Sequence, residues 1–499
     1  MVRLAVLRQS LLKVQAIDYT DVEISGITSD SRRVRPGALF TAIHGYTVDG
    51  HDFAAAAVAA GAVAVVVERP LPGLAVPQLV VPDCRLASAI LSDVFYGHPS
   101  HHLRMIGVTG TNGKTTVTHL IERVLTDTGH KVGMYGTIGK HIGGVTEDVA
   151  NTTPEAVDLQ GILHEMVDQG CTYGVMEVSS HALELRRVAG TRYHIAVFTN
   201  LTQDHLDFHG TMENYLAAKG KLFSRLGNTY GEDRRTMSYS VLNQDDPASL
   251  YLRQQTVTEC VTYGVHAESD FRAKDIRVES DGTRFTVDTP VGLWPIHLKL
   301  TGRFNVYNAL AALAVGWIEE IPMPQVIAAL QQVTGIPGRL ERVDAGQPFT
   351  ILVDYSHTPD SLDNALRTVR ELTRNRVLCV VGCGGDRDKG KRPQMAKIAC
   401  NLSDDVIFTS DNPRTEEPER ILDDMEIGVQ GRYENYRRLT DRQKAIEWAV
   451  QHAVPGDVLL IAGKGHETYQ IIGREKRHFD DREVAKTAVT RFYGTTRGE

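Results

Sequence analysis

The segment Gly107-Val-Thr-Gly-Thr-Asn-Gly-Lys114-Thr115-Thr116 decides the fold of this chain. An apolar run, LRMIGV, comes before it and indicates a strand. The stretch 114–129 after it indicates a helix that ends at Gly129. The apolar residues of that helix fall on one face at helical spacing: Val117, Leu120, Ile121, Val124 and Leu125. A glycine turn between strand and helix lets backbone N–H groups surround phosphate oxygens. The segment therefore predicts a phosphate-binding loop.

Two side chains of this loop have chemistry that suits a nucleotide. Lys114 would reach the β- and γ-phosphates, and the hydroxyl of Thr115 would bind magnesium. Val108 stands where the strict pattern G-x-x-x-x-G-K-T has its first glycine, but the strand before and the helix after compensate for it. No guanine-reading N-K-x-D segment occurs, which weakens the interpretation as a GTPase.

Strand and helix signals alternate on both sides of the loop. Short apolar runs such as AVAVVV occur before it, and FTILVDY, RVLCVVG, DDVIFTS and DVLLIAG occur near the C-terminus. The predicted class is α/β, with three domains that each form a mainly open, largely parallel sheet covered by helices. Their predicted bounds are 1–98, 99–335 (P-loop ATPase-like) and 336–499 (Rossmann-like). Polar or glycine-rich segments follow the strands, where open α/β sheets bind ligands.

Composition excludes several classes of function. A net charge of −8 over 499 residues argues against a nucleic-acid binder. Six cysteines are too few for a disulfide framework, so reduced thiols are expected. The N-terminal residues lack a signal peptide's apolar core, and the uncharged, alanine- and valine-rich run 53–67 is too short to span a bilayer. We expect a cytoplasmic protein with no membrane insertion.

A cation site is predicted beside the loop. Glu177 ends the apolar strand YGVMEV, and His205 follows the strand HIAVFTN. A lone strand-end glutamate is more often an ion-pair partner, but with Thr115 these residues offer oxygen and imidazole ligands at one sheet edge. Magnesium takes few protein ligands and keeps water and phosphate oxygens for the rest. Asp204 and Asp207 would then support the ligands.

Further segments occur in the order of a known family: NTTPE (151–155), EVSSHAL (177–183), TNLTQDHLDFHG (199–210), AAKGKLF (217–223), GRFNVYNA (302–309), GIPGRLE (335–341), DYSHTPDSL (354–362), GCGGDRDKGKRP (382–393), DNPRTEEP (411–418) and AGKGHETYQ (462–470). Over nearly its whole length the chain resembles the Mur ligase family. The resemblance implies a UDP-substrate domain, a central ATPase domain and an amino-acid domain, in a monomer that acts in peptidoglycan synthesis with Mg²⁺. ATP would phosphorylate the γ-carboxylate of UDP-N-acetylmuramoyl-L-alanyl-D-glutamate, and the amine of meso-diaminopimelate would then displace phosphate.

The resemblance also implies ATP-site and catalytic residues. The positions that match the ATP site are Gly110, Thr111, Asn112, Gly113, Lys114, Thr115, Thr116, Asn305, Asn308, Arg339 and Asp354. The positions that match catalytic residues are Lys114, Glu177, His205, Lys219 and His357. Lys219 matches the lysine that is carbamylated in these ligases, which would make it a metal ligand beside Thr115, Glu177 and His205.

Matches to the UDP-precursor site are distributed over two predicted domains. They are Ser29, Ser31, Tyr46, Asn151, Thr152, Thr153, Ser179 and Arg187. The chain departs from the family pattern at Leu185, where glutamine is frequent, so one hydrogen bond to the precursor is missing or replaced. Ser356 replaces a commoner alanine.

The preference for diaminopimelate over lysine rests on one extra carboxylate, which needs a cation. Arg414, held in a turn by Pro413, is the expected bidentate partner, and Arg387 could also bind a carboxylate. Glu467 would pair with the distal ammonium. The full predicted amino-acid site is Arg387, Asp411, Asn412, Pro413, Arg414, Gly463 and Glu467.

Alternative functions remain at this stage. The same reaction could use L-lysine or another amino acid, or the chain could be a ligase like folylpolyglutamate synthase. The UDP-type N-terminal residues and DNPR argue against the latter. A non-enzymatic nucleotide-binding regulator would bind ATP without releasing phosphate, and the intact GTNGKT and KGKR segments argue against it.

Overall fold

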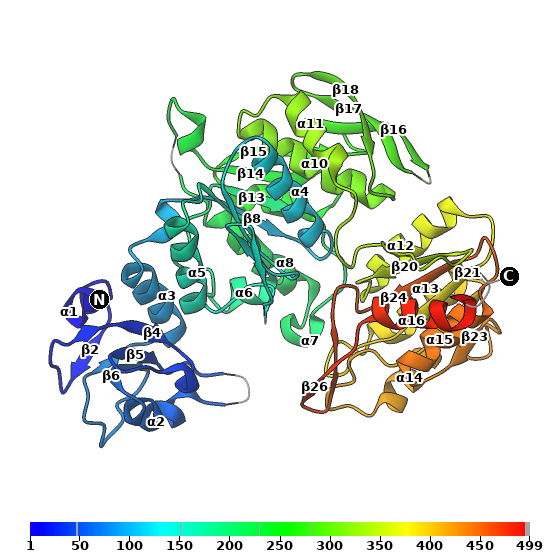
Figure 1. Ribbon diagram of the computed structural model, residues 1–499. Coiled ribbons are helices and arrows are strands. Elements are labelled where there is room, and N and C mark those ends of the chain that lie inside the picture. The colour runs from blue at the N-terminus through cyan, green and yellow to red at the C-terminus, as the bar shows by residue number, and fades with distance from the viewer. Residues whose placement is uncertain (46–47, 150, 229, 280, 495–499) are drawn as a thin grey trace.

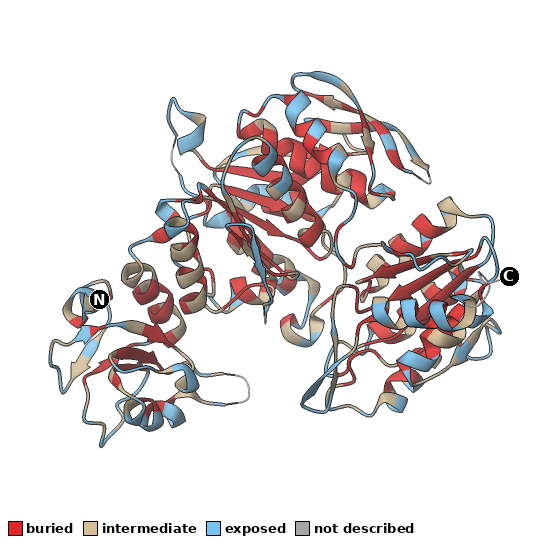
Figure 2. Cartoon of the chain, in the orientation of Figure 1, coloured by how far each residue is buried: buried red, intermediate tan, exposed pale blue. Residues whose placement is uncertain are grey.

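The chain forms three large sheets that follow one another along the sequence, as a computed structural model shows (Figure 1). The structure describes residues 1–45, 48–149, 151–228, 230–279 and 281–494. The blue N-terminal sheet and the C-terminal sheet, coloured from yellow to orange-red, lie on either side of the central one in Figure 1, and buried strands run through all three (Figure 2). The α/β class predicted from the sequence is confirmed.

The N-terminal sheet has the order β2-β7-β6-β5-β4. Its strands are β2 (Gln15–Ile17), β4 (Gly26–Thr28), β5 (Ala38–Thr41), β6 (Ala62–Val67) and β7 (Gln78–Val80), and its helices are α1 (Leu4–Gln9), α2 (Ala54–Ala59) and α3 (Cys84–Phe95). Side chains of β6 alternate between two apolar clusters: Ala64 and Val66 enter one, and Val65 and Val67 the other. Helices therefore cover both faces. A short pair, β1 (Val2–Arg3) and β3 (Glu23–Ile24), lies beside the sheet.

The central sheet has eleven strands in the order β11-β10-β9-β12-β8-β13-β14-β15-β16-β17-β18. The strands β8 (Arg104–Thr109), β9 (Val132–Tyr135), β12 (Tyr173–Glu177), β13 (Ile195–Phe198), β14 (Tyr239–Asn243), β15 (Glu259–Gly264) and β16 (Phe271–Glu279) pair in parallel. The parallel sheet was predicted. The antiparallel additions at its edges were not: β10 (Lys140–Ile142), β11 (Val145–Glu147), β17 (Gly282–Thr289) and β18 (Gly292–Leu298).

The helices of the central region bury the phosphate-loop strand from both sides. Helix α4 (Lys114–Asp127) buries all five predicted apolar residues, and it packs against α10 (Arg303–Ile318) and α11 (Met323–Gln332). The opposite face carries α5 (Ala156–Asp168), α6 (Ser180–Glu184) and α8 (Met212–Ser224), with α7 (Leu206–His209) and α9 (Ala248–Gln255) nearby. Gly129 follows α4 with a φ of 90°, as expected for the residue that ends a helix.

The C-terminal sheet has the order β19-β20-β24-β21-β22-β23 and is parallel except at β19. Its strands are β19 (Glu341–Val343), β20 (Thr350–Asp354), β21 (Val377–Val381), β22 (Asp405–Phe408), β23 (Tyr436–Arg438) and β24 (Val458–Ala462). One face packs on α12 (Pro359–Leu372), α13 (Lys391–Leu402) and α14 (Pro418–Glu426), and the other on α15 (Arg442–His452) and α16 (Asp481–Tyr493). A hairpin of β25 (Tyr469–Ile472) and β26 (Glu475–His478) lies beside it.

The cysteines and the lengths of the helices bear on two expectations from the sequence. All six cysteines are free, and five of them are buried. Among the helices of the described residues, none is both long and apolar enough to cross a bilayer.

Candidate functional site

The glycine loop connects β8 to α4 at the carboxyl edge of the central sheet. Val108 is fully buried within β8, so the position where the strict motif has glycine belongs to the strand here rather than to the turn. Gly110 has a φ of 148°, and a side chain there would collide with the Thr199 hydroxyl. Gly113 has a φ of 85°, and a Cβ there would lie 2.6 Å from Oδ1 of Asn308. The loop requires both glycines.

The lysine of the loop folds back over the turn. Nζ of Lys114 donates to the carbonyl oxygens of Gly110 at 3.0 Å and Thr111 at 2.8 Å. Burial lowers the pKa of Lys114, while the carboxylates of Glu177 and Asp204 act in the opposite direction. The ammonium group thus lies at the phosphate loop in a partly desolvated position, where its charge is weakly screened.

Glu177 is a buried carboxylate held by neutral groups. Its oxygens accept from the Thr115 hydroxyl at 3.0 Å and from the Thr137 backbone N–H at 2.7 Å and hydroxyl at 3.0 Å. Within the described part of the chain, no Lys, Arg or His lies within ion-pair distance of it. Arg339 donates to the same Thr115 hydroxyl at 3.0 Å. A buried carboxylate without a basic partner suits a metal cation.

A second group of charged residues surrounds Asp204. Its oxygens lie 3.3 Å from Nε2 of His205, 3.6 Å from Nζ of Lys391 and 3.9 Å from Nε2 of His357. Burial alone would raise the pKa of Asp204, but these neighbours hold it well below its ordinary value. Burial lowers the pKa of His205 to about 3 and that of His357 to about 4, so both rings are neutral near pH 7.

Lys219 lies beneath the loop. Its side chain is buried, its Nζ donates to the Gly110 carbonyl oxygen at 2.8 Å, and the Tyr215 ring lies 4.4 Å away. Burial, with the nearby charge of Lys114, lowers the pKa of Lys219 well below its ordinary value. A solvated helix lysine would be exposed, whereas this one is buried, and burial disfavours its charged form.

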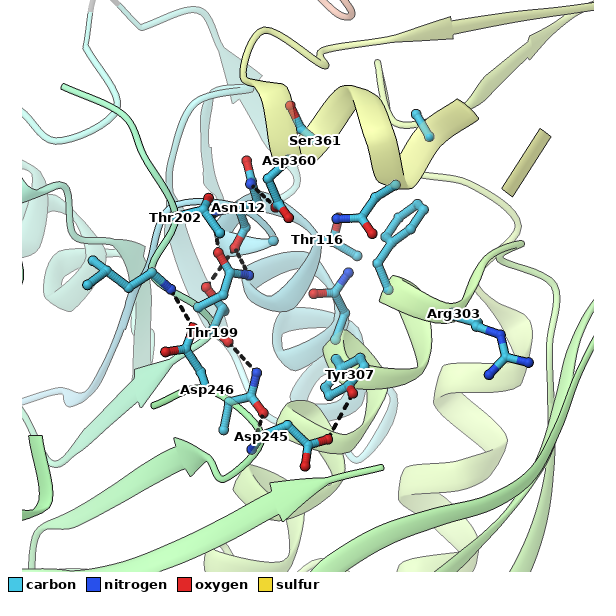
Figure 3. Close-up of a pocket in the computed structure, with 18 of the residues that line it drawn as sticks. Asn112, Thr116, Thr199, Thr202, Asp245, Asp246, Arg303, Tyr307, Asp360 and Ser361 are labelled. Atoms are coloured by element: carbon cyan, nitrogen blue, oxygen red, sulfur yellow. Dashed lines mark hydrogen bonds between the residues drawn. The ribbon is translucent and has the colours of Figure 1, made fainter. Parts of the chain in front are cut away.

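A cavity of about 470 Å³ opens between the central and C-terminal regions (Figure 3). Asn112, Thr116 and Tyr307 line it, and Asp360 reaches it from α12, accepting from Nδ2 of Asn112 at 2.8 Å. Asn308 and Asp354 also line it. Asn305 does not, but its Oδ1 accepts from Asn308 Nδ2 at 3.0 Å and so orients that amide.

A second cavity, of about 280 Å³, brings distant sequence segments together. Its lining includes Lys114 and Thr115 from the glycine loop, Glu177 from β12 and Arg414 from the C-terminal region. Other predicted residues in its lining are Thr111, Asn112, Gly113, Thr152, Ser179, His205, Arg339, His357, Arg387, Asp411, Asn412, Gly463 and Glu467. The loop and Arg414 thus share one cleft despite their separation in sequence.

Arg387 and Arg414, two of the three arginines that line this cavity, have no acidic partner among the described residues. Nη1 of Arg414 donates to the Gly385 carbonyl oxygen at 2.8 Å, and Nη1 of Arg387 to the Asp386 carbonyl oxygen at 2.9 Å. In the described ranges neither forms an ion pair with a carboxylate. Burial, and then the charge of Arg387, lower the pKa of Arg414. Two guanidinium groups without acidic partners in one cavity are suited to binding an anion.

Glu467 has partners within the protein. Its Oε2 accepts from Nζ of the buried Lys464 at 2.8 Å and from Nδ2 of Asn412 at 2.9 Å. A Cβ on Gly463 would lie 2.5 Å from Oδ2 of Asp411, so this glycine lets two segments approach closely. Pro413 is buried, and Arg414 has a φ of 52°, so the turn holds its arginine in a strained conformation.

The predicted precursor residues do not gather in one place. Thr153 is fixed by its hydroxyl, which donates to the Glu177 carbonyl oxygen at 2.9 Å, and Arg187 donates to the Thr153 carbonyl oxygen at 3.1 Å. Asn151 lines a third cavity of about 410 Å³ with Arg33 and Lys140. Ser29 and Ser31 follow β4 and line none of the three cavities. Tyr46 lies outside the described residues, and Leu185 is half-buried and directly follows α6.

Three residues with a place in the site were not predicted. Thr137 binds Glu177, Lys391 approaches Asp204, and Lys464 pairs with Glu467. Lys391 and Lys464 lie inside GCGGDRDKGKRP and AGKGHETYQ, so their segments were already identified. Thr137 lies in none of the identified segments, and a threonine after a strand is too common in proteins to indicate a functional site.

Three family models match the chain. They are the Mur ligase family catalytic domain at residues 23–94, the Mur ligase middle domain at 108–316 and the Mur ligase glutamate ligase domain at 338–465.

Relatives and solved structures match the chain over most of its length. The UDP-N-acetylmuramoyl-L-alanyl-D-glutamate--2,6-diaminopimelate ligase of Geobacillus thermodenitrificans is 53% identical over 467 residues, covering 94% of this chain and 95% of the relative. The Bacillus cereus protein of the same name is 51% identical, with 94% of each chain covered. A solved structure of a ligase of that name has 34% identity and a TM-score of 0.65, covering 94% of this chain and 95% of the other.

Proposed function

The chain belongs to the Mur ligase family, and from that membership we propose that it adds meso-diaminopimelate to the D-glutamyl γ-carboxylate of UDP-N-acetylmuramoyl-L-alanyl-D-glutamate, with ATP as co-substrate. The names of relatives about half identical to it support this reaction. The observation that carries the proposal is the shared cavity, in which the phosphate loop faces two arginines without acidic partners.

The reaction needs two anions to meet, so positive groups must lie between them. A γ-carboxylate oxygen of the precursor attacks the terminal phosphorus of ATP, which forms an acyl phosphate and releases ADP. The amine of the amino acid then attacks the acyl carbon, and phosphate leaves with the bonding electron pair. Lys114 and Arg339 are the proposed residues that stabilise charge on the transferred phosphoryl group, with His357 on the facing wall.

The residues around Glu177 fit magnesium. A buried carboxylate 3.0 Å from the Thr115 hydroxyl, with no basic side chain beside it in the described residues, provides the hard oxygen ligands that Mg²⁺ prefers. We propose Thr115, Glu177, His205 and the carbamate of Lys219 as its ligands. A bound Mg²⁺ would neutralise part of the negative charge on the phosphate groups.

The environment of Lys219 supports its proposed carbamylation. Carbamate forms when a neutral amine attacks carbon dioxide, making an N–C bond and releasing a proton. Burial favours the neutral amine of Lys219. The product is an anion, and the cations at this edge of the sheet would stabilise it.

Arg414 and Arg387 are the proposed partners of the distal carboxylate of diaminopimelate, beside Asp411, Asn412, Gly463 and Glu467. L-Lysine lacks that carboxylate and would leave the guanidinium groups unpaired. A buried polar group without a partner costs binding free energy, so lysine is the poorer substrate.

We propose the nucleotide base site in the larger cavity, at Asn112, Thr116 and Asn308. A solved Thermotoga maritima MurF ligase in complex with ADP has the same fold, at 20% identity and a TM-score of 0.65. The proposed UDP-precursor site extends from Ser29 and Ser31 towards Asn151. Arg33 and Asp158 form an ion pair of 2.8 Å between the N-terminal region and α5. Domain boundaries near residues 98 and 335 and a monomeric state are part of the proposal.

One assay tests the reaction. Phosphate release from ATP is measured with UDP-N-acetylmuramoyl-L-alanyl-D-glutamate and either meso-diaminopimelate or L-lysine. We expect release that depends on the UDP-precursor and is much faster with diaminopimelate. Release with lysine at an equal rate would refute the specificity, and release only with a folate and glutamate would refute the reaction. No feature of the site favours a folate ligase, because the likeness to Mycobacterium tuberculosis folylpolyglutamate synthase, at 18% identity, reaches only the fold.

A further inference from the structure

Three potential metal ligands meet on the side of the helix that follows the phosphate loop. His119 and Glu122 lie one turn apart on α4, and His141 lies on the neighbouring strand β10. One ligand atom from each falls within 4.8 Å of the others. The two imidazole rings are 5.6 Å apart between centroids, and Nδ1 of His141 lies 3.4 Å from a carboxylate oxygen of Glu122.

His119 is held in the form that binds a metal. Its Nδ1 lies 2.8 Å from the Thr115 carbonyl oxygen, which can only accept, so Nδ1 carries the hydrogen and Nε2 keeps its lone pair. Nε2 is buried and has no hydrogen-bond partner among the described residues. Metal-binding histidines usually donate their other ring N–H to such a carbonyl.

Solvent can reach the other two ligands. The side chain of His141 is 23% exposed and that of Glu122 is 22% exposed, so an ion can enter from this side. None of the three residues lines the cavity of about 280 Å³ at the phosphate loop or the cavity of about 470 Å³ proposed for the nucleotide base. The cluster is therefore separate from the proposed Mg²⁺ ligands, although it shares helix α4 with Thr115.

We propose that His119, Glu122 and His141 bind one transition-metal ion of the zinc class, with water as the fourth ligand. Two imidazoles and one carboxylate suit Zn²⁺ or Co²⁺, whereas Mg²⁺ favours sites made mainly of oxygen ligands. At Zn–N distances of about 2.0–2.1 Å, the ligand atoms of a tetrahedral site lie about 3.4 Å apart. Binding thus draws these side chains together and links α4 to the β9–β10 hairpin, which also carries Thr137.

The plainest alternative is an ordinary ion pair of Glu122 with His141, with His119 as a half-buried neighbour. Metal binding distinguishes the two. The full-length protein, saturated with Mg²⁺, is titrated with Zn²⁺ in equilibrium dialysis and with Co²⁺ in visible absorption. We expect one Zn²⁺ per chain and a Co²⁺ spectrum of tetrahedral intensity.

Four variants locate the site. His119→Ala and His141→Ala should each weaken Zn²⁺ binding by more than about tenfold, and Glu122→Gln should weaken it less. His102→Ala, which removes an exposed histidine from another loop, is the matched control and should bind normally. Thermal unfolding shows whether each variant is folded. If His119→Ala is unstable, His141→Ala and Glu122→Gln still decide the test. The side chains of His141 and Glu122 are partly exposed, so replacing them should leave the protein folded.

Two outcomes overturn the proposal. One is wild-type affinity and stoichiometry in folded His141→Ala and Glu122→Gln. The other is Zn²⁺ binding that Glu177→Gln abolishes while these variants retain it, which would place the ion at the phosphate loop.

Discussion

Replacing Arg414 by alanine should selectively impair the use of diaminopimelate. Only Nη1 of Arg414 is engaged in the described part of the chain, by the Gly385 carbonyl, so Nε and Nη2 remain for a substrate carboxylate. Two charge-assisted hydrogen bonds contribute about 1.5–3 kcal/mol each. Partial exposure and the neighbouring Arg387 reduce the loss, so we expect about 3 kcal/mol, or roughly a hundredfold in kcat/KM.

The assay is steady-state phosphate release with diaminopimelate varied at saturating ATP and UDP-precursor. The loss should appear in the KM for diaminopimelate, while the KM for the UDP-precursor stays near the wild-type value. The slow rate with L-lysine should change little, because lysine has no carboxylate for Arg414 to bind.

Arg420→Ala is the matched control, because this arginine is exposed on nearby α14 and its side chain makes no ion pair in the described residues. Unchanged kcat/KM for diaminopimelate in a folded Arg414→Ala protein would refute the assignment. An equal loss with lysine would show that the arginine serves general catalysis or folding instead.

Three more perturbations test other parts of the site. Lys219→Ala should lower kcat by more than about tenfold, and added acetate should restore part of the activity if a carboxylate is the missing group. Carbamylation would be contradicted if acetate restored no activity and mass spectrometry of the wild-type protein showed Lys219 without the added carboxylate. Gly113→Ala should cost about 1–2 kcal/mol of backbone strain and raise the KM for ATP, because the new Cβ would lie 2.6 Å from Oδ1 of Asn308. Gly129→Ala is the control: Gly129 has a similar φ, but a Cβ there would meet no neighbouring atom, so this variant should lower only the thermal midpoint. Stability should fall as the pH drops below about 6.5, because burial lowers the pKa of His194 to about 4 and the unfolded chain takes up the proton first. The loss is up to about 2 kcal/mol near pH 5, and urea denaturation of His194→Asn, which should show a smaller dependence, checks it.

Several structural features could be predicted from local sequence. Short continuous apolar runs predicted β6, β20 and β24, and helical spacing predicted the buried face of α4. Such patterns depend on neighbours within one element, so the sequence contains them directly. The hairpins at both edges of the central sheet were missed. Exposed and buried positions do not alternate regularly in β16 and β18, and β16 also carries several charged residues, so their periodicity is weak.

The chemistry of single residues was harder to predict. Nothing near Lys219 in the sequence distinguishes it from a solvated helix lysine, and only packing beneath the loop buries it and lowers its pKa. The contact of Lys391 with Asp204 likewise joins segments almost two hundred positions apart.

The sequence by itself determined that a glycine turn joins a strand to a helix and that polar residues follow the ends of parallel strands. Each of these is a local property of backbone conformation and side-chain polarity. Only the tertiary structure decided that Thr115, Glu177 and Arg414 line one cavity, that two arginines there lack acidic partners, and that His119 meets His141. The reason is physical, since the pairing of distant strands and the packing between sheets depend on the burial of whole surfaces, which no single segment specifies.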